Sequence, residues 1–193
     1  MQEILDAAVA VLHERGYAGA TMLAVASRAS ASKETLYAWF GNKRGLFEAV
    51  IRANAGQVDA ALTAGLAQAA APKGALGDFG RALLTLLLSE PAVTINRAAI
   101  SEAASTPAFG SILAAAGRDS VVPKLTAYLD QQKRLGNLSF TDAQDAAETL
   151  IALLIGDLQV RRLLGVFAKP DAHWIESRAS RAVAQFLRLY GPY

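Results

Sequence analysis

The stretch SKETLYAWFGNKRGLF, residues 32–47, decides the fold of this chain. A serine that can cap a helix opens the stretch, and the apolar residues Leu36 and Phe40 follow four positions apart. Gly41 then interrupts the pattern, and Asn42 can cap a second helix that has a lysine at its start. This pattern predicts a short recognition helix, a tight break and a helix whose beginning contacts the phosphate backbone of DNA.

The composition favours a folded chain with a local binding surface. Of its 193 residues, 53% are hydrophobic, which is enough to bury a sizeable core. The formal net charge is only +2, so we do not expect a surface that coats nucleic acid along its whole length. The absence of cysteine excludes disulfides and thiolate metal sites.

The sequence predicts no targeting or membrane segment. The first residues carry acids and no basic region, so we do not expect a secretory signal. The most apolar runs, residues 82–88 and 150–155, are far shorter than the roughly 20 residues of a membrane helix. We therefore expect a soluble, cytoplasmic protein.

Apolar residues recur at helical spacing along almost the whole chain, and runs with period-two alternation are absent, which predicts an all-α fold. The first helix is expected to close at Gly16, the second to be capped by Thr21, and the fourth to run from Asn42 to about Leu66. We place the domain boundary near residue 52, with an N-terminal domain at 1–52 and a second helical domain at 53–193. In the latter we expect helices at 77–89, from Pro91, at 118–134, from 141 or 142 to about 164, and from 170 or 171 to about 190.

The second and third helices are joined by only a few residues around 30–32, which is the spacing of a helix-turn-helix. The charge agrees with this placement. Residues 21–52 hold five basic and two acidic residues, a net charge of +3, whereas residues 53–193 hold 13 basic and 12 acidic residues. The small positive excess therefore lies mainly where DNA would bind.

Over residues 3–52 the sequence closely resembles the N-terminal domain of the TetR family of transcriptional regulators. The matching residues are Ile4 to Ala8, Glu14 to Tyr17, Thr21, Val25, Ala26, Ala29, Ser32 to Tyr37, Phe40, Asn42, Lys43, Leu46 and Phe47. The resemblance implies that Thr21 and Lys43 contact phosphates. It also implies that the third helix faces the major groove with Lys33, Glu34, Thr35 and Tyr37.

The chemistry of these side chains suits the implied roles, although other interpretations stay open. Lys33 can reach guanine, and Glu34 can accept a hydrogen bond from cytosine N4. Alternatively, Tyr37 is partly buried packing, Glu34 only complements the helix dipole, and Lys43 is an ordinary solvated charge. We assign Leu36 and Phe40 to the core, and we expect Trp39 in the core more than at a DNA contact.

Three departures from the family pattern predict modest DNA affinity or an unusual operator. The turn before the third helix usually holds Gly and Val, whereas Ser30 and Ala31 stand here, so the turn must form without glycine at a position that needs φ > 0. Leu23 occupies a position that is often basic in the family. The chain also begins almost at the first helix, without the usual basic arm.

The TetR resemblance implies that the C-terminal helices bind a small ligand and dimerise. This part of the chain resembles the AefR-like branch more weakly, through residues 97–104, 136–138 and 156–165. We expect a mainly apolar effector, and each residue that could contact it also has a structural or surface interpretation. The candidate ligand-binding residues are Asn96, Arg97, Phe109, Tyr128 and Gln159.

The last two predicted helices carry more apolar surface than one chain is expected to bury, which favours a two-fold four-helix interface between two copies. A single larger monomeric core is the alternative. The predicted interface residues are Ile151, Leu154, Leu158, Ile175, Ala179, Val183 and Phe186.

These patterns and the TetR resemblance predict a ligand-responsive transcriptional regulator that binds a near-palindromic double-stranded DNA operator as a homodimer and is released by a small-molecule effector. The sequence alone does not separate a repressor from an activator, and the resemblance implies a repressor because repression is the family's usual mode. We expect no cofactor, no metal and no catalytic residue. An enzyme is the first alternative function, but the only histidines of this chain, His13 and His173, lie near no catalytic motif. The second alternative is a helical ligand-binding or partner-binding module with weak or lost DNA binding.

Overall fold

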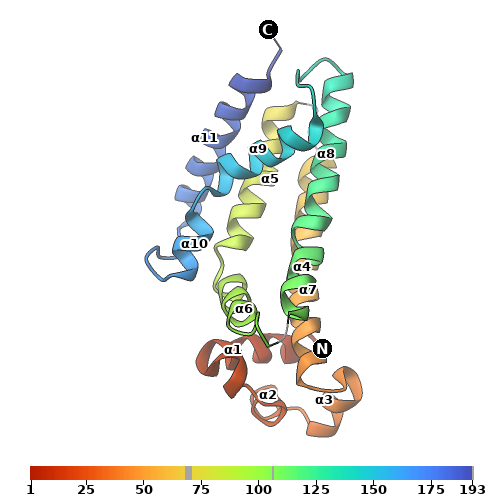
Figure 1. The fold of residues 1–193 in the computed structure, drawn as a ribbon, viewed down its shortest axis with the longest axis vertical. Coiled ribbons are helices and arrows are strands. Elements are labelled where there is room, and N and C mark those ends of the chain that lie inside the picture. Colours follow the sequence, from red (N-terminus) through yellow and green to blue (C-terminus); the bar gives the residue numbers. More distant parts are fainter. Residues whose placement is uncertain (68–70, 106, 193) are drawn as a thin grey trace. The chain divides into compact units, whose positions relative to one another are not determined.

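The computed structural model describes residues 1–67, 71–105 and 107–192, and every regular element in these ranges is a helix (Figure 1). This confirms the predicted all-α fold. The helices are α1 (Gln2–Gly19), α2 (Met22–Arg28), α3 (Lys33–Phe40), α4 (Lys43–Ala67), α5 (Pro72–Leu87), α6 (Glu90–Ser101), α7 (Ala108–Ala116), α8 (Arg118–Arg134), α9 (Ala143–Ile155), α10 (Leu158–Leu163) and α11 (Ala172–Tyr190).

The chain divides into two compact units, and the division falls within α4. Residues 1–56 and 90–116 form the first unit, and residues 57–89 and those from 117 onward form the second. The boundary predicted near residue 52 also lies in α4, but that prediction assigned α6 and α7 to the C-terminal part. Both helices instead pack with the N-terminal unit, where Ile95, Ala99 and Phe109 are buried in the same core as α1 to α4.

Side-chain caps define the helices of the first unit as the sequence predicted. The Thr21 hydroxyl accepts a hydrogen bond from the backbone N–H of Ala24 at 3.1 Å, and Asn42 Oδ1 accepts one from the N–H of Gly45 at 2.9 Å. Each cap satisfies an N–H group that the helix itself leaves unpaired. Gly16 has φ 64°, so it interrupts α1 as expected, although one further helical turn follows it.

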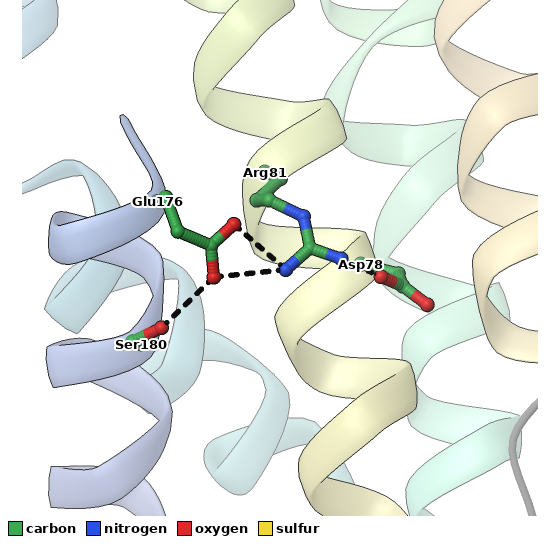
Figure 2. Close-up of polar contacts among 4 residues, drawn as sticks. All are labelled: Asp78, Arg81, Glu176 and Ser180. Carbon is green, nitrogen blue, oxygen red and sulfur yellow. Dashed lines mark hydrogen bonds and ion pairs between the residues drawn. The ribbon is translucent and has the colours of Figure 1, made fainter. Parts of the chain in front are cut away.

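The second unit is built on α5, α9 and α11, which pack around one apolar core. The close approach of these helices depends on Gly80, where an added Cβ would lie 2.7 Å from Leu154 Cδ2 and 3.3 Å from Ala179 Cβ. At the solvent edge, Arg81 of α5 pairs with Glu176 of α11 at 2.9 Å and with Asp78 of its own helix (Figure 2). Exposed pairs of this kind contribute little, so the apolar contacts hold the helices together.

The predicted dimer interface stays a prediction, but most of its residues lie in the core of one chain. A single chain buries six of the seven predicted interface residues, because α5 covers the apolar stripe that the sequence left without a partner. Ile151 is half-buried and packs against the same core. The six buried residues are Leu154, Leu158, Ile175, Ala179, Val183 and Phe186.

The long helix predicted from 141 or 142 to about 164 is also wrong. Asp142 caps α9 as expected, but Gly156 adopts φ 49° and ends that helix, and α10 follows as a separate short helix. In the second unit, Arg162 of α10 is buried and donates hydrogen bonds to the carbonyls of Leu88 and Phe167 at 3.2 and 3.0 Å. These bonds fasten α10 against the end of α5.

Within the described residues no single helix has both the length and the apolar composition needed to cross a membrane. Among the same residues, only α5 and α6 taken together, as a bent pair, have the length and the apolar composition of a membrane-spanning segment.

Candidate nucleic-acid interface

The turn between α2 and α3 sets the position of the predicted recognition helix. Ser30 has φ 50°, and it is the only residue other than glycine with a positive φ among the described residues. The next residue, Ala31, donates its backbone N–H to the carbonyl of Ala26 at 3.0 Å, which closes the turn. The turn therefore adopts the conformation that usually needs glycine, and a serine bears the steric cost.

Replacing Ser30 with glycine is expected to raise the free energy of unfolding by roughly 0.5–1 kcal/mol, because glycine adopts φ 50° without a Cβ clash. Ser27→Gly is the matched control. It places glycine inside α2, where it should lower stability by about 0.5 kcal/mol. Thermal unfolding of both variants measures these changes in stability. A Ser30→Gly variant less stable than the parent chain would contradict the claim that Ser30 is strained in this turn.

Helix α3 presents one buried face and one exposed face. Leu36 is fully buried, whereas Lys33, Glu34 and Tyr37 are exposed, and the Tyr37 side chain retains 44% of its accessible surface. Lys33 Nζ lies 5.6 Å from the centre of the Tyr37 ring, so the two side chains share one flank of the helix. Their exposure supports contact with DNA and argues against Tyr37 as mere packing, but the contacts themselves stay a prediction.

Trp39 was expected in the core, and the structure shows that this is wrong. Its side chain is 49% exposed and touches Phe40 in an edge contact, with ring centroids 6.2 Å apart. The three-residue step from Leu36 to Trp39 turns the indole about 60° away from the buried side of the helix. Helical spacing could have revealed this, since a short helix with a single buried position cannot cover a tryptophan on its flank.

The start of α3 is polar and hydrogen-bonded. Ser32 Oγ accepts the backbone N–H of Thr35 at 3.0 Å and lies 3.0 Å from the Thr35 hydroxyl, so half-buried Thr35 is engaged within the helix start. The pKa of Glu34 is lowered, first by a hydrogen bond from its own backbone N–H and then by the Ser32 side chain. The carboxylate is thus stabilised in the form that accepts hydrogen bonds.

Two of the five basic residues between 21 and 52 are engaged by acids. Arg28 pairs with Glu14 at 2.5 Å, and Arg44 pairs with Glu48 at 2.8 Å. These pairs reduce the local positive charge, which places more weight on the lysines for attraction to phosphate.

Lys43 is half-buried at the start of α4, so the structure does not show it as an ordinary solvated charge. Its Nζ donates to the carbonyl of Ala18 at 3.3 Å and lies 4.1 Å from the centre of the Tyr17 ring. Burial lowers the pKa of Lys43, and the nearby Glu102 charge acts in the opposite direction. Thr21, by comparison, is exposed, and its oxygen is used as the cap of α2.

The α3–α4 junction is closely packed. Gly41 has φ 73°, and an added Cβ at Gly45 would lie 2.1 Å from the carbonyl oxygen of Phe40. Only a glycine allows the first turn of α4 to approach the end of α3 this closely. The junction therefore fixes the position of Lys43 relative to the recognition helix.

The five candidate ligand-binding residues are divided between the two units. Asn96, Arg97 and Phe109 lie in the first unit, where Asn96 Nδ2 donates to the Ala92 carbonyl at 2.8 Å and Phe109 is buried in the core. Tyr128 and Gln159 lie in the second unit. Their role in ligand binding stays a prediction.

Tyr128 is distinctive among these candidates. Its side chain is buried, and its hydroxyl is one of two buried side-chain polar atoms without a hydrogen-bond partner in the described residues. Burial raises its pKa, so the hydroxyl remains protonated and able to donate. We also find no cluster of three or more His, Asp or Glu side chains that could hold a metal ion in the described part of the chain.

Two family models match the sequence. Residues 4–50 match "Bacterial regulatory proteins, tetR family", and residues 74–192 match "AefR-like transcriptional repressor, C-terminal domain". No curated protein matches the chain.

Solved structures give the same result over nearly the full length. A TetR-family regulator structure from Mesorhizobium loti has a TM-score of 0.86 at 26% identity, covering 98% of this chain and 96% of that one. A TetR regulator from Agrobacterium tumefaciens has a TM-score of 0.74 at 32% identity, covering 99% and 94%. The flavonoid-responsive regulator FrrA has a TM-score of 0.71 at 26% identity, covering 99% and 96%.

Proposed function

Because the chain belongs to the TetR family of bacterial transcriptional regulators, with an AefR-like C-terminal domain, we propose that it is a repressor that a small-molecule effector releases from its operator. The observation that supports this most is the division of α3 into a buried face at Leu36 and an exposed face with Lys33, Glu34 and Tyr37. The lysine, the carboxylate and the phenol on this face supply the hydrogen-bond donors and acceptors that contacts with base edges need.

In this proposal α3 reads base edges, while Thr21 and Lys43 contact phosphates. Lys33 donates to guanine, Glu34 accepts from cytosine N4, and Thr35 and Tyr37 complete the face toward the groove. We add Trp39 as a contact to the DNA backbone, because its indole is exposed on the flank of α3 and its N–H can donate to a phosphate.

The operator-bound form is proposed to be a homodimer. Because the core of one chain occupies the inner faces of α9 and α11, we place the dimer contact on their outer faces. The exposed residue Ala152 lies there on α9, and the exposed residues Ser177, Arg181 and Ala184 share one side of α11 at helical spacing. A two-fold dimer carries two copies of α3, so it would require a near-palindromic operator.

The effector is proposed to be mainly apolar, with at least one hydrogen-bonding group. Buried polar groups are almost always hydrogen-bonded, and the Tyr128 hydroxyl lies in an apolar core without a partner in the described residues. A ligand that supplies an acceptor to this hydroxyl would gain affinity at little cost. The flavonoid-responsive relative, at 26% identity, makes flavonoids the first compounds to test, since they combine an aromatic body with hydroxyl and carbonyl oxygens.

Tyr128→Phe is expected to raise the flavonoid concentration that releases DNA by about tenfold, because a hydrogen bond is worth roughly 1–1.5 kcal/mol. Stability and DNA affinity without flavonoid should not fall, since the hydroxyl has no protein partner to lose. Tyr190→Phe is the matched control. It also removes a tyrosine hydroxyl, but one that has a partner within the protein, Thr149 Oγ1 at 3.3 Å. Release at the same concentration in the parent chain and in Tyr128→Phe would rule out this contact.

DNA binding itself is tested by fluorescence anisotropy with labelled duplex DNA at several salt concentrations. The proposal expects the logarithm of affinity to fall linearly with the logarithm of salt concentration, with a slope of about −0.9 for each phosphate contacted. A helical ligand-binding or partner-binding module with lost DNA binding is the alternative. It would show no saturable binding at low salt.

A further inference from the structure

The ammonium group of Lys43 is held by the end of α1. Nζ lies 4.1 Å from the centroid of the Tyr17 ring, within the range of a cation–π contact, and donates to the carbonyl of Ala18 at 3.3 Å. One hydrogen bond and one ring face thus restrain a side chain that has four rotatable carbon–carbon bonds. An ammonium group has three N–H donors, so donors remain for a further acceptor.

The Tyr17 ring is itself fixed on two sides. It makes edge contacts with Phe47 of α4 and Phe109 of α7, at centroid distances of 5.1 and 4.8 Å and interplanar angles of 68° and 77°. Both phenylalanines are buried, with exposed fractions of 4% and 2%. The positive φ of Gly16, directly before Tyr17, puts a kink in α1 at this point.

Burial and the surrounding charges together determine the pKa of the Tyr17 phenol. Burial raises the pKa of Tyr17, and the charges of Glu102 and Glu48 act in the same direction while Arg44 opposes them. The phenol is therefore neutral, and its ring face remains attractive to a cation. Glu102 also favours the charged form of Lys43.

We propose that Tyr17 is a positioning residue for DNA binding, which holds the Lys43 ammonium at the start of α4 so that its remaining N–H groups meet a DNA phosphate. This inference rests on the proposed function. A lysine free in solvent must lose its rotamer freedom on binding, and here the Tyr17 ring and the Ala18 carbonyl have already removed most of it. Because Phe109 of α7 packs against the Tyr17 ring, α7 also supports the phosphate contact, although α7 is far from Lys43 in the sequence.

The test is the salt dependence of duplex binding in four chains: the parent, Lys43→Ala, Tyr17→Leu and Tyr17→Phe. Lys43→Ala should weaken binding about tenfold and reduce the salt slope by about 1 for each chain bound. Tyr17→Leu should lower the affinity and the slope in the same direction, and should add little when combined with Lys43→Ala. Tyr17→Phe keeps the ring face and should bind like the parent chain.

Because Tyr17→Leu can disturb the fold, a second series places phenylalanine analogues with increasing ring fluorination at position 17. Fluorine removes electron density from the ring face while almost preserving its shape, so affinity should fall stepwise when Lys43 is present and stay constant in Lys43→Ala. Equal affinity and slope across the fluorinated series, or tighter binding as fluorine is added, would overturn the inference. A parent chain that binds no duplex would overturn the proposed function as well, whereas a parent chain whose binding depends on Lys43 but not on the ring would overturn this inference alone.

Discussion

Gly45→Ala is expected to reduce DNA affinity by at least about 100-fold. The new Cβ would lie 2.1 Å from the carbonyl oxygen of Phe40 and 3.2 Å from its carbonyl carbon, and both atoms belong to the backbone, which cannot move without shifting the end of α3. The shift would separate the Lys43 contact from the base contacts of α3, and each such contact is worth roughly 1–3 kcal/mol. We also expect a loss of roughly 1–3 kcal/mol in the free energy of unfolding, as in overpacked cores.

The matched control for this change is Gly56→Ala, in the same helix. An added Cβ at Gly56 meets nothing within 4 Å, so alanine should stabilise α4 by roughly 0.5–1 kcal/mol and leave DNA affinity unchanged. Anisotropy titration with duplex DNA and thermal unfolding measure the two effects separately. Parent-like DNA affinity in Gly45→Ala would show that the α3–α4 junction does not position the DNA-binding residues.

Phe186→Ala is expected to lower the free energy of unfolding by about 3–5 kcal/mol, a large part of the stability of a typical domain. Phe186 is fully buried within one chain, and its ring contacts Tyr190 at a centroid distance of 4.9 Å. Truncation would leave a cavity among α5, α9 and α11 that these packed helices cannot close. Urea denaturation, compared at several protein concentrations, measures the loss.

Leu189→Ala, in the same helix, is the control. Leu189 is 62% exposed, so its truncation should change stability by less than about 0.5 kcal/mol. The comparison also distinguishes two positions of Phe186. The structure buries it within one chain, whereas the sequence pattern predicted it between two chains. A Phe186→Ala chain that becomes monomeric but keeps its stability would favour the sequence pattern over the packing described above.

The local structure of the N-terminal helices could be predicted because it depends on short-range chemistry. Thr21, Ser32 and Asn42 each satisfy backbone N–H groups within three residues, and Gly16 and Gly41 take positive φ where the helices are interrupted. Leu36 was correctly assigned to the core, because an apolar residue at that spacing has only one face of α3 on which to pack. Trp39 was assigned wrongly because its type was given more weight than its angular position.

The packing of distant segments could not be predicted from these patterns. The apolar stripe of α11 indicates that it must be covered, but not whether α5 or a second chain covers it, and residues such as Leu154 and Val183 look the same in both cases. Phe109 and Asn96 were grouped with Tyr128 because all three are polar or aromatic residues of central helices. The structure places the first two with the DNA-binding helices, and the unpaired Tyr128 hydroxyl becomes visible only when its surroundings are known.

The central claim is that α3 reads a specific DNA sequence, and selection of bound duplexes from a random pool by the purified protein tests it most directly. The account predicts enrichment of a near-palindrome whose half-sites lie about one helical turn apart, roughly 10 base pairs centre to centre. Repeating the selection with Glu34→Ala should relax the preference at one base pair in each half-site, where the carboxylate accepts its hydrogen bond. Equal binding to selected and random duplexes would contradict the claim.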